Sequence, residues 1–153
     1  MYRQKGFTLV ELVVVIVILG LLAATALPRY ISLTRQAREA SVEGVAGGLR
    51  AAVALARAQY LVNQSSGATT ISMEGQSVNV RSGTDWYAGS PDATAGGIDV
   101  AFPVPDGWTF NQAGAADQEA SFVPEGYAAT DCGVTYDPDR TPQQIVTVTS
   151  DCS

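Results

Sequence analysis

The sequence of 153 residues contains no histidine and only two cysteines. Histidine is the commonest general base near neutral pH and the commonest ligand of transition metals. Its absence argues against most enzyme classes and most metal centres. We therefore expect a protein that is not an enzyme, with no catalytic residues, no cofactor and no metal site.

Positive charge is scarce in the second part of the chain. Residues 58–153 contain only Arg81 and Arg140 against twelve acidic residues, a net charge of −10, whereas residues 7–57 carry +2. Phosphate binding requires clustered lysine or arginine. We therefore expect no nucleic-acid partner, and the acidic charge favours solubility outside the cell.

Charge of either sign is almost absent near the N-terminus. Between Phe7 and Leu27 the only charged residue is Glu11, and as a helix these residues would span roughly 32 Å, about one hydrocarbon core. The segment can therefore cross a membrane once. A carboxylate in lipid costs roughly 2.5–3.5 kcal/mol near the bilayer centre and less near a helix end, so Glu11 calls for a partner or a function.

The helical pattern continues beyond this apolar segment. Apolar residues recur every three or four positions from Val42 to Tyr60, which predicts an amphipathic helix. Pro28 removes one backbone donor and can bend the axis without ending the helix. We expect one long helix with a membrane half, residues 7–28, and a half that packs on a folded head, residues 29–63.

Residues 64–153 have the two-residue period of β-strands. A hairpin is predicted on either side of Glu74-Gly75. Further short strands are expected at residues 108–110, 120–123, 134–136 and 145–149, the last two paired. The fold class is α+β, with a long N-terminal helix packed against a small antiparallel β-sheet head.

Two cysteines lie near the C-terminus. Cys132 and Cys152 would form a disulfide in an exported domain, and closing a loop of about 20 residues would contribute about 3 kcal/mol. The alternative is a pair of free thiols in a cytosolic protein. The upstream membrane segment favours the disulfide.

Two interpretations of Glu11 can hold together. Thr8-Leu9-Val10-Glu11 fits the capping box, in which a threonine and a glutamate satisfy free backbone donors at a helix start. If the chain were cut after Gly6, the new amino group of Phe7 would be a cation that Glu11 could neutralise, in the same chain or a neighbouring copy.

The apolar helix also predicts assembly. Removed from lipid, such a helix survives in water only inside a bundle of copies of itself. Heterologous contacts that do not close produce an open helical filament. We expect the segments from Phe7 to Leu27 at its axis, the acidic heads outside, and Phe7 paired with Glu11 across subunits.

The run G-F-T-L-V-E at residues 6–11, followed by an apolar helix with Gly20 and Pro28, resembles the processing site and N-terminal helix of a type IV prepilin. The short leader and Phe7 resemble the type IVa module. The helix, the G-G-I-D run and the terminal cysteines are similar to pilins of the mannose-sensitive haemagglutinin type.

The resemblance implies a set of roles for this N-terminal region. A prepilin peptidase would cut between Gly6 and Phe7, removing leader 1–6, and would methylate Phe7. Glu11 would recruit and register the subunit. Filaments of this family often lose helicity between the positions matching Gly20 and Pro28, which act as helix breakers.

The same resemblance implies the partners and the location. The subunit would sit in the inner membrane with its head, residues 64–153, on the periplasmic side, and would meet an assembly platform there. Identical subunits would then form a cell-surface pilus for adhesion, motility or related functions. The cysteines would bound the C-terminal loop of the head.

Two other functions remain open. The first is a pseudopilin of a type II secretion or DNA-uptake apparatus, built from the same N-terminal module. The second is an exported binding domain with an ordinary signal peptide cut near Ala24-Thr25-Ala26. Glu11 and the length of the apolar run count against the second alternative.

Three weaker features have ordinary structural explanations. Four aspartates near the cysteine loop could bind calcium, but their spacing matches no defined loop and a solvated acidic loop is favoured. Four aromatic residues could form a binding patch, but packing is favoured. Asn63-Gln64-Ser65 fits a glycosylation pattern that is common by chance. The aspartates are Asp131, Asp137, Asp139 and Asp151, and the aromatic residues are Trp86, Tyr87, Trp108 and Tyr127.

Overall fold

The computed structural model describes residues 6–63, 67–112, 119–141 and 144–153. Leader residues 1–5 and Gln64-Ser65 of the glycosylation pattern lie outside the described residues. The chain divides into two compact units, a helical segment that ends at Ala37 and a head from Arg38 to Cys152. The functional bounds 7–28 and 29–63 remain predictions.

One helix, α1, runs from Leu9 to Val62 and belongs to both units. The helix continues through Gly20 and Pro28 without a break. The prediction of a single long helix is therefore confirmed. The loss of helicity between Gly20 and Pro28 concerns the assembled filament and stays a prediction.

The strands of the head form two antiparallel sheets within the described residues. Strands β1 (Thr70–Met73) and β2 (Gln76–Asn79) form a hairpin. Its loop residues Glu74 and Gly75 both have positive φ, 50° and 83°. A two-residue type I′ turn, which matches the right-handed twist of the strands, requires positive φ at both positions. The predicted hairpin is confirmed.

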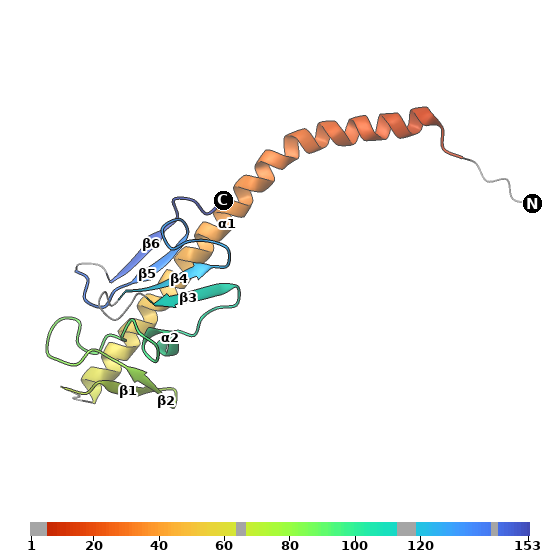
Figure 1. Cartoon of the computed structure of the whole chain (residues 1–153). Coiled ribbons are helices and arrows are strands. Elements are labelled where there is room, and N and C mark those ends of the chain that lie inside the picture. Colours follow the sequence, from red (N-terminus) through yellow and green to blue (C-terminus); the bar gives the residue numbers. More distant parts are fainter. Residues whose placement is uncertain (1–5, 64–66, 113–118, 142–143) are drawn as a thin grey trace, which may run out of the picture. The chain divides into compact units, whose positions relative to one another are not determined.

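The larger sheet has the order β3-β4-β5-β6, and Figure 1 shows these strands side by side. Each strand pairs antiparallel with the next, and the predicted pairing of the last two strands is confirmed by the register of Tyr136 with Ile145. The strands are β3 (Trp108–Gln112), β4 (Ala120–Pro124), β5 (Gly133–Tyr136) and β6 (Ile145–Val148).

The head part of α1 supplies one face to two apolar cores. Val42, Leu49 and Val53 pack with the larger sheet, where Phe122 and Tyr136 are fully buried. Further along, Ala56 and Tyr60 pack on the hairpin beside Ile71 and Val78. The α+β class and the packing of the helix on β-structure are confirmed.

Two details differ from the sequence-based prediction. The hairpin does not join the other strands in one sheet, because Val80 after β2 forms only an isolated bridge to Pro91. Residues 83–99 are mostly irregular as expected, but they end in a short helix, α2 (Ile98–Ala101). Four residues are too few to show a helical period.

Candidate assembly site at the N-terminal helix

The N-terminal segment of α1 exposes large apolar side chains on all sides. From Leu9 to Leu22 they are between 43% and 77% exposed, and Phe7 before the helix is 90% exposed. Among the described residues, α1 is the one helix long and apolar enough to cross a membrane by length and composition. Such a surface requires lipid or protein to cover it.

The capping box at the start of α1 is present. The backbone N–H of Thr8 donates to Glu11 Oε2 at 2.9 Å, and the Thr8 hydroxyl donates to the same oxygen at 2.6 Å. In return, the Glu11 N–H donates to Thr8 Oγ1 at 3.3 Å. The capping interpretation is confirmed, and the pairing of Glu11 with the Phe7 amino group stays a prediction.

Residues 6–8 precede the helix and have no regular secondary structure. Gly6 and Phe7 are both exposed there. The Gly6–Phe7 bond therefore lies in exposed, non-helical backbone, and its cleavage stays a prediction.

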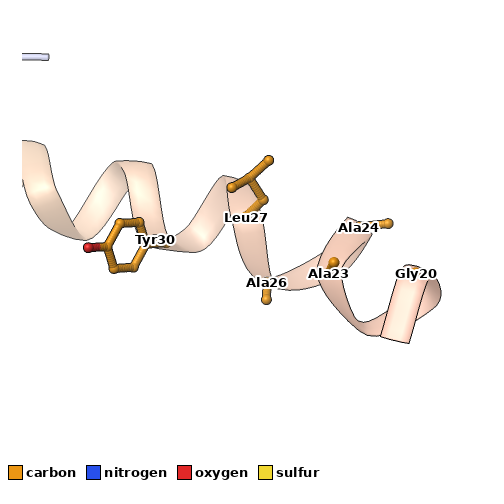
Figure 2. A pocket seen from close by; sticks show the side chains of 6 residues that line it. All are labelled: Gly20, Ala23, Ala24, Ala26, Leu27 and Tyr30. Carbon is orange, nitrogen blue, oxygen red and sulfur yellow. The ribbon is translucent and has the colours of Figure 1, made fainter. Parts of the chain in front are cut away.

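A shallow apolar hollow of about 500 Å³ lies along α1 between Gly20 and Tyr30. Figure 2 shows that its small side chains come from successive turns of the helix, with Leu27 and Tyr30 at one end. A methyl group built on Gly20 would meet no described atom within 4 Å. Small residues of this kind let another helix approach closely.

The disulfide lies in the head. Cys132 and Cys152 are bonded and fully buried. The Arg38 guanidinium on α1 donates to the Cys152 carbonyl oxygen at 3.1 Å and lies 5.3 Å from the centre of the Tyr127 ring. The disulfide and the hydrogen bond from Arg38 together hold Cys152 beside α1 within the head.

Three of the aspartates near the disulfide have partners within the head. Asp131 accepts from the Thr130 hydroxyl, Asp137 accepts from the Asp139 N–H, and Asp139 pairs with Arg81. Within the described ranges, no three histidine, cysteine or acidic side chains are placed to hold a metal ion.

The four aromatic residues do not form one patch. The Trp86 and Tyr87 rings meet edge to face at 5.6 Å, whereas Trp108 and Tyr127 pack against the main core. A hydrogen bond to the Asp85 carboxylate raises the pKa of the Tyr87 hydroxyl. The packing interpretation holds for Trp108 and Tyr127.

The sequence did not predict the ion pairs of Arg81 with Asp139 and Asp92. Its side chain pairs with Asp139 and lies 3.6 Å from Asp92 Oδ1, beside a hollow of about 430 Å³. Burial raises the pKa of the Asp92 carboxyl, and the nearby Arg81 opposes that shift. The available signal was the scarcity of arginine in this part of the chain, since isolated cations among many acids are usually paired.

Comparisons with known proteins show which family the chain belongs to. Residues 1–27 match the family model of the prokaryotic N-terminal methylation motif. Over 57 residues, covering 37% of this chain and 49% of the relative, the chain is 53% identical to the type IV narrow pilus major component PilA5 of Thermus thermophilus. Over 124 residues it is 32% identical to the type IV major fimbrial protein FimA of Dichelobacter nodosus, covering 78% of this chain and 69% of the relative. The chain belongs to the type IV pilin family.

Other matches to type IV pilins are confined to a shorter region. Over 50 residues the chain is 50% identical to the type IV major pilin protein PilE1 of Neisseria gonorrhoeae, covering 33% of this chain and 30% of the relative. The chain thus spans about half the length of the Thermus relative and less of the Neisseria relative. No solved structure matches it significantly. Type IV pilins are structural proteins, so the expectation of a protein that is not an enzyme is confirmed.

Proposed function

We propose that this type IV pilin is a structural subunit that polymerises into a type IV pilus on the cell surface. The observation that carries the proposal is the exposed apolar surface of α1 from Leu9 to Leu27. Burying apolar surface yields about 25 cal/mol for each Å² removed from water, so a bundle of these helices is strongly favoured over free subunits in water. Contacts between different surfaces of identical subunits extend into an open helical filament when the rotation between subunits does not close a ring.

Before assembly, the subunit sits in the inner membrane with its head on the periplasmic side. The acidic head and the buried disulfide suit the oxidising compartment outside the inner membrane. The apolar segment occupies the bilayer until an assembly platform in the inner membrane transfers it to the base of the filament. Identical subunits, the platform and a prepilin peptidase are its partners.

The peptidase cuts between Gly6 and Phe7 and methylates the new amino group. Support comes from the match of residues 1–27 to the methylation motif and from the exposed, non-helical backbone at this bond. Two residues, Phe7 and Thr8, separate the cut from Leu9, where the helix begins. Cleavage therefore leaves the capping box between Thr8 and Glu11 intact.

Glu11 then pairs with the Phe7 amino group of its own or a neighbouring subunit. Both Thr8 donors end on Oε2, and within the part of the chain that the structure describes no donor reaches Oε1. Oε1 is therefore the oxygen that accepts from the amine. In a dry filament core an unpaired carboxylate costs several kcal/mol, so a pair formed with a neighbouring subunit selects one register between subunits.

A strain that lacks the chain tests the proposal when complemented with the wild type or with Gly6→Leu. Electron microscopy and peptide mapping of the sheared surface fraction identify filaments and their subunit. We expect wild-type filaments that contain this chain, and none from Gly6→Leu because a bulky residue at the cut blocks cleavage. If the wild type restores no filament that contains the chain, the proposal is wrong.

A further inference from the structure

The turn before β3 contains an aspartate followed by a glycine. The pair is Asp106-Gly107, and no other aspartate or asparagine in the sequence is followed by glycine. The turn is closed by a hydrogen bond from the Trp108 N–H to the Pro105 carbonyl oxygen at 3.1 Å. Asp106 and Gly107 are both exposed. The pair therefore meets water on the surface of the head.

The Asp106 side chain is not held by a partner. Within the part of the chain that the structure describes, no hydrogen bond or ion pair reaches its carboxylate. Other exposed aspartates differ, because Asp85 accepts from the Tyr87 hydroxyl and Asp131 accepts from the Thr130 hydroxyl. The Asp106 carboxyl is therefore free to rotate towards its own backbone.

The Gly107 nitrogen is accessible to that carboxyl. Its N–H donates to none of the described residues, and a methyl group built on Gly107, whose φ is 77°, would meet no described atom within 4 Å apart from its chain neighbours. Glycine also lacks the side chain that would hinder a close approach to its backbone. After three other aspartates, the following N–H already donates to a backbone carbonyl oxygen. These N–H groups belong to Val100, Cys132 and Arg140.

We propose that Asp106-Gly107 is a site of spontaneous isoaspartate formation in the folded chain. The Gly107 nitrogen attacks Cγ of the protonated Asp106 carboxyl. The amide hydrogen and the carboxyl hydroxyl leave as water, which closes a succinimide ring. Water then adds to the backbone carbonyl carbon of Asp106 and breaks its bond to the Gly107 nitrogen. The chain now continues through Cγ, the α-carboxylate is released, and the mass is unchanged.

The reaction needs no enzyme and no partner. Both reacting groups are neighbours in one chain, so their proximity replaces the entropy loss of a bimolecular encounter. The proposal therefore goes beyond the proposed function and does not depend on filament assembly.

The product changes the start of β3. The new linkage adds one carbon atom to the backbone inside the turn that joins Pro105 to Trp108, and the Gly107 carbonyl oxygen of this turn accepts from the Glu125 N–H at 2.9 Å. β3 is an edge strand of the larger sheet and pairs with β4. Its residues Trp108 and Phe110 pack against the main core. Conversion therefore loosens β3 at the edge of the sheet.

Incubation of the purified full-length chain in detergent micelles tests the site. Samples are kept at physiological temperature and mildly acidic pH for weeks. Mass spectrometry with electron-transfer fragmentation then distinguishes isoaspartate from aspartate at each position. Asp106→Glu is the negative control, because it keeps the charge but would have to close a larger, less favourable ring. Asp106→Asn is the positive control, because it forms the same ring with loss of ammonia and gains mass on hydrolysis.

We expect about tenfold or more isoaspartate at Asp106 than at Asp85 or Asp131, since only Asp106 has both an unheld carboxyl and an accessible nitrogen after it. Asp106→Glu should show no conversion at this position, and Asp106→Asn should gain mass. The site is wrong if isoaspartate at Asp106 does not exceed that at Asp85 and Asp131, or if the Asn variant keeps its mass.

Hydrogen exchange of the β3 amides tests the consequence for the sheet. The incubated wild type should exchange these amides faster than the fresh wild type, whereas incubated Asp106→Glu should exchange them at the rate of its fresh sample. Equal exchange in incubated and fresh wild type, at a measured high conversion, would overturn the loosening of β3.

Discussion

The Thr8 hydroxyl and the Thr8 backbone N–H donate to the same oxygen of Glu11, at 2.6 and 2.9 Å. The carboxylate therefore caps the helix with one oxygen. The cap and the proposed pair with the Phe7 amine do not compete for the same atom.

Replacing Glu11 with glutamine separates the two roles. The glutamine side chain retains an amide oxygen that can accept from Thr8 but carries no charge, so we expect α1 to form while filament mass falls about tenfold or more, because the charge pair is lost. Filaments are quantified by electron microscopy of the sheared fraction. The matched control is Thr8→Val, which removes the hydroxyl and keeps the charge. Equal filament yields from Glu11→Gln and the wild type would leave Glu11 with capping alone.

Replacing Cys132 with alanine should destabilise the head. The bond closes a loop with a sequence separation of 20, and its loss from the folded chain costs about 3 kcal/mol in the chain-entropy model. Thermal unfolding should show a lower midpoint, and reduction of the wild type should lower it by a similar amount. An unchanged midpoint in both experiments would contradict a stabilising role for the bond.

Alanine at the adjacent positions Gly47 and Gly48 should have opposite effects on the head. At Gly47 the added methyl group meets open space, so the higher helix propensity of alanine should stabilise the head by about 1 kcal/mol. At Gly48 it must displace the Phe102 ring, which packs edge to face on Phe122 at 5.8 Å, and we expect a loss of about 1–3 kcal/mol. Urea unfolding measures the change in the free energy of unfolding for both variants. A change of the same sign in both would contradict the different surroundings of the two glycines.

Burial of Asp92 makes a defined contribution to the pH dependence of stability. Its pKa is raised in the folded state, so the native chain binds this proton more tightly than the unfolded chain. The group therefore lowers stability as the pH rises from below the usual aspartate pKa through the raised value. Relative to the wild type, Asp92→Asn should gain stability as the pH rises from about 3 towards neutrality. Urea titrations at several pH values measure the stability of Asp92→Asn relative to the wild type. If that difference is constant or falls as the pH rises, the raised pKa of Asp92 is contradicted.

Local patterns in the sequence were sufficient to predict most of the fold. The two-residue period predicted β1 and β2, and Glu74-Gly75 predicted their turn. The three-to-four residue spacing of Val42 to Tyr60 predicted the buried face of α1. These features depend on residues that are neighbours in the chain or on one face of one element.

The features that the sequence did not predict depend on distant residues. The separation of the hairpin from the larger sheet is associated with the segment after β2, where the Asp92 N–H donates to the Asn79 carbonyl and Arg81 exchanges backbone hydrogen bonds with Gly89 and Ser90. The buried Tyr136 hydroxyl donates to the Pro91 carbonyl at 2.6 Å, 45 residues away. The Glu11 capping box was predictable because its two residues are three positions apart, whereas the partners of Arg81 were not.

The most direct test of the account is the N-terminus of the mature protein. Filaments are sheared from cells, and the intact mass and N-terminal peptide of their main subunit are measured. The account predicts a chain that begins at Phe7 and carries one added methyl group on its amino nitrogen. A mature chain that begins near Leu27, after an ordinary signal-peptide cut, would lack Glu11 and most of the apolar surface of α1, and would contradict filament assembly through that helix.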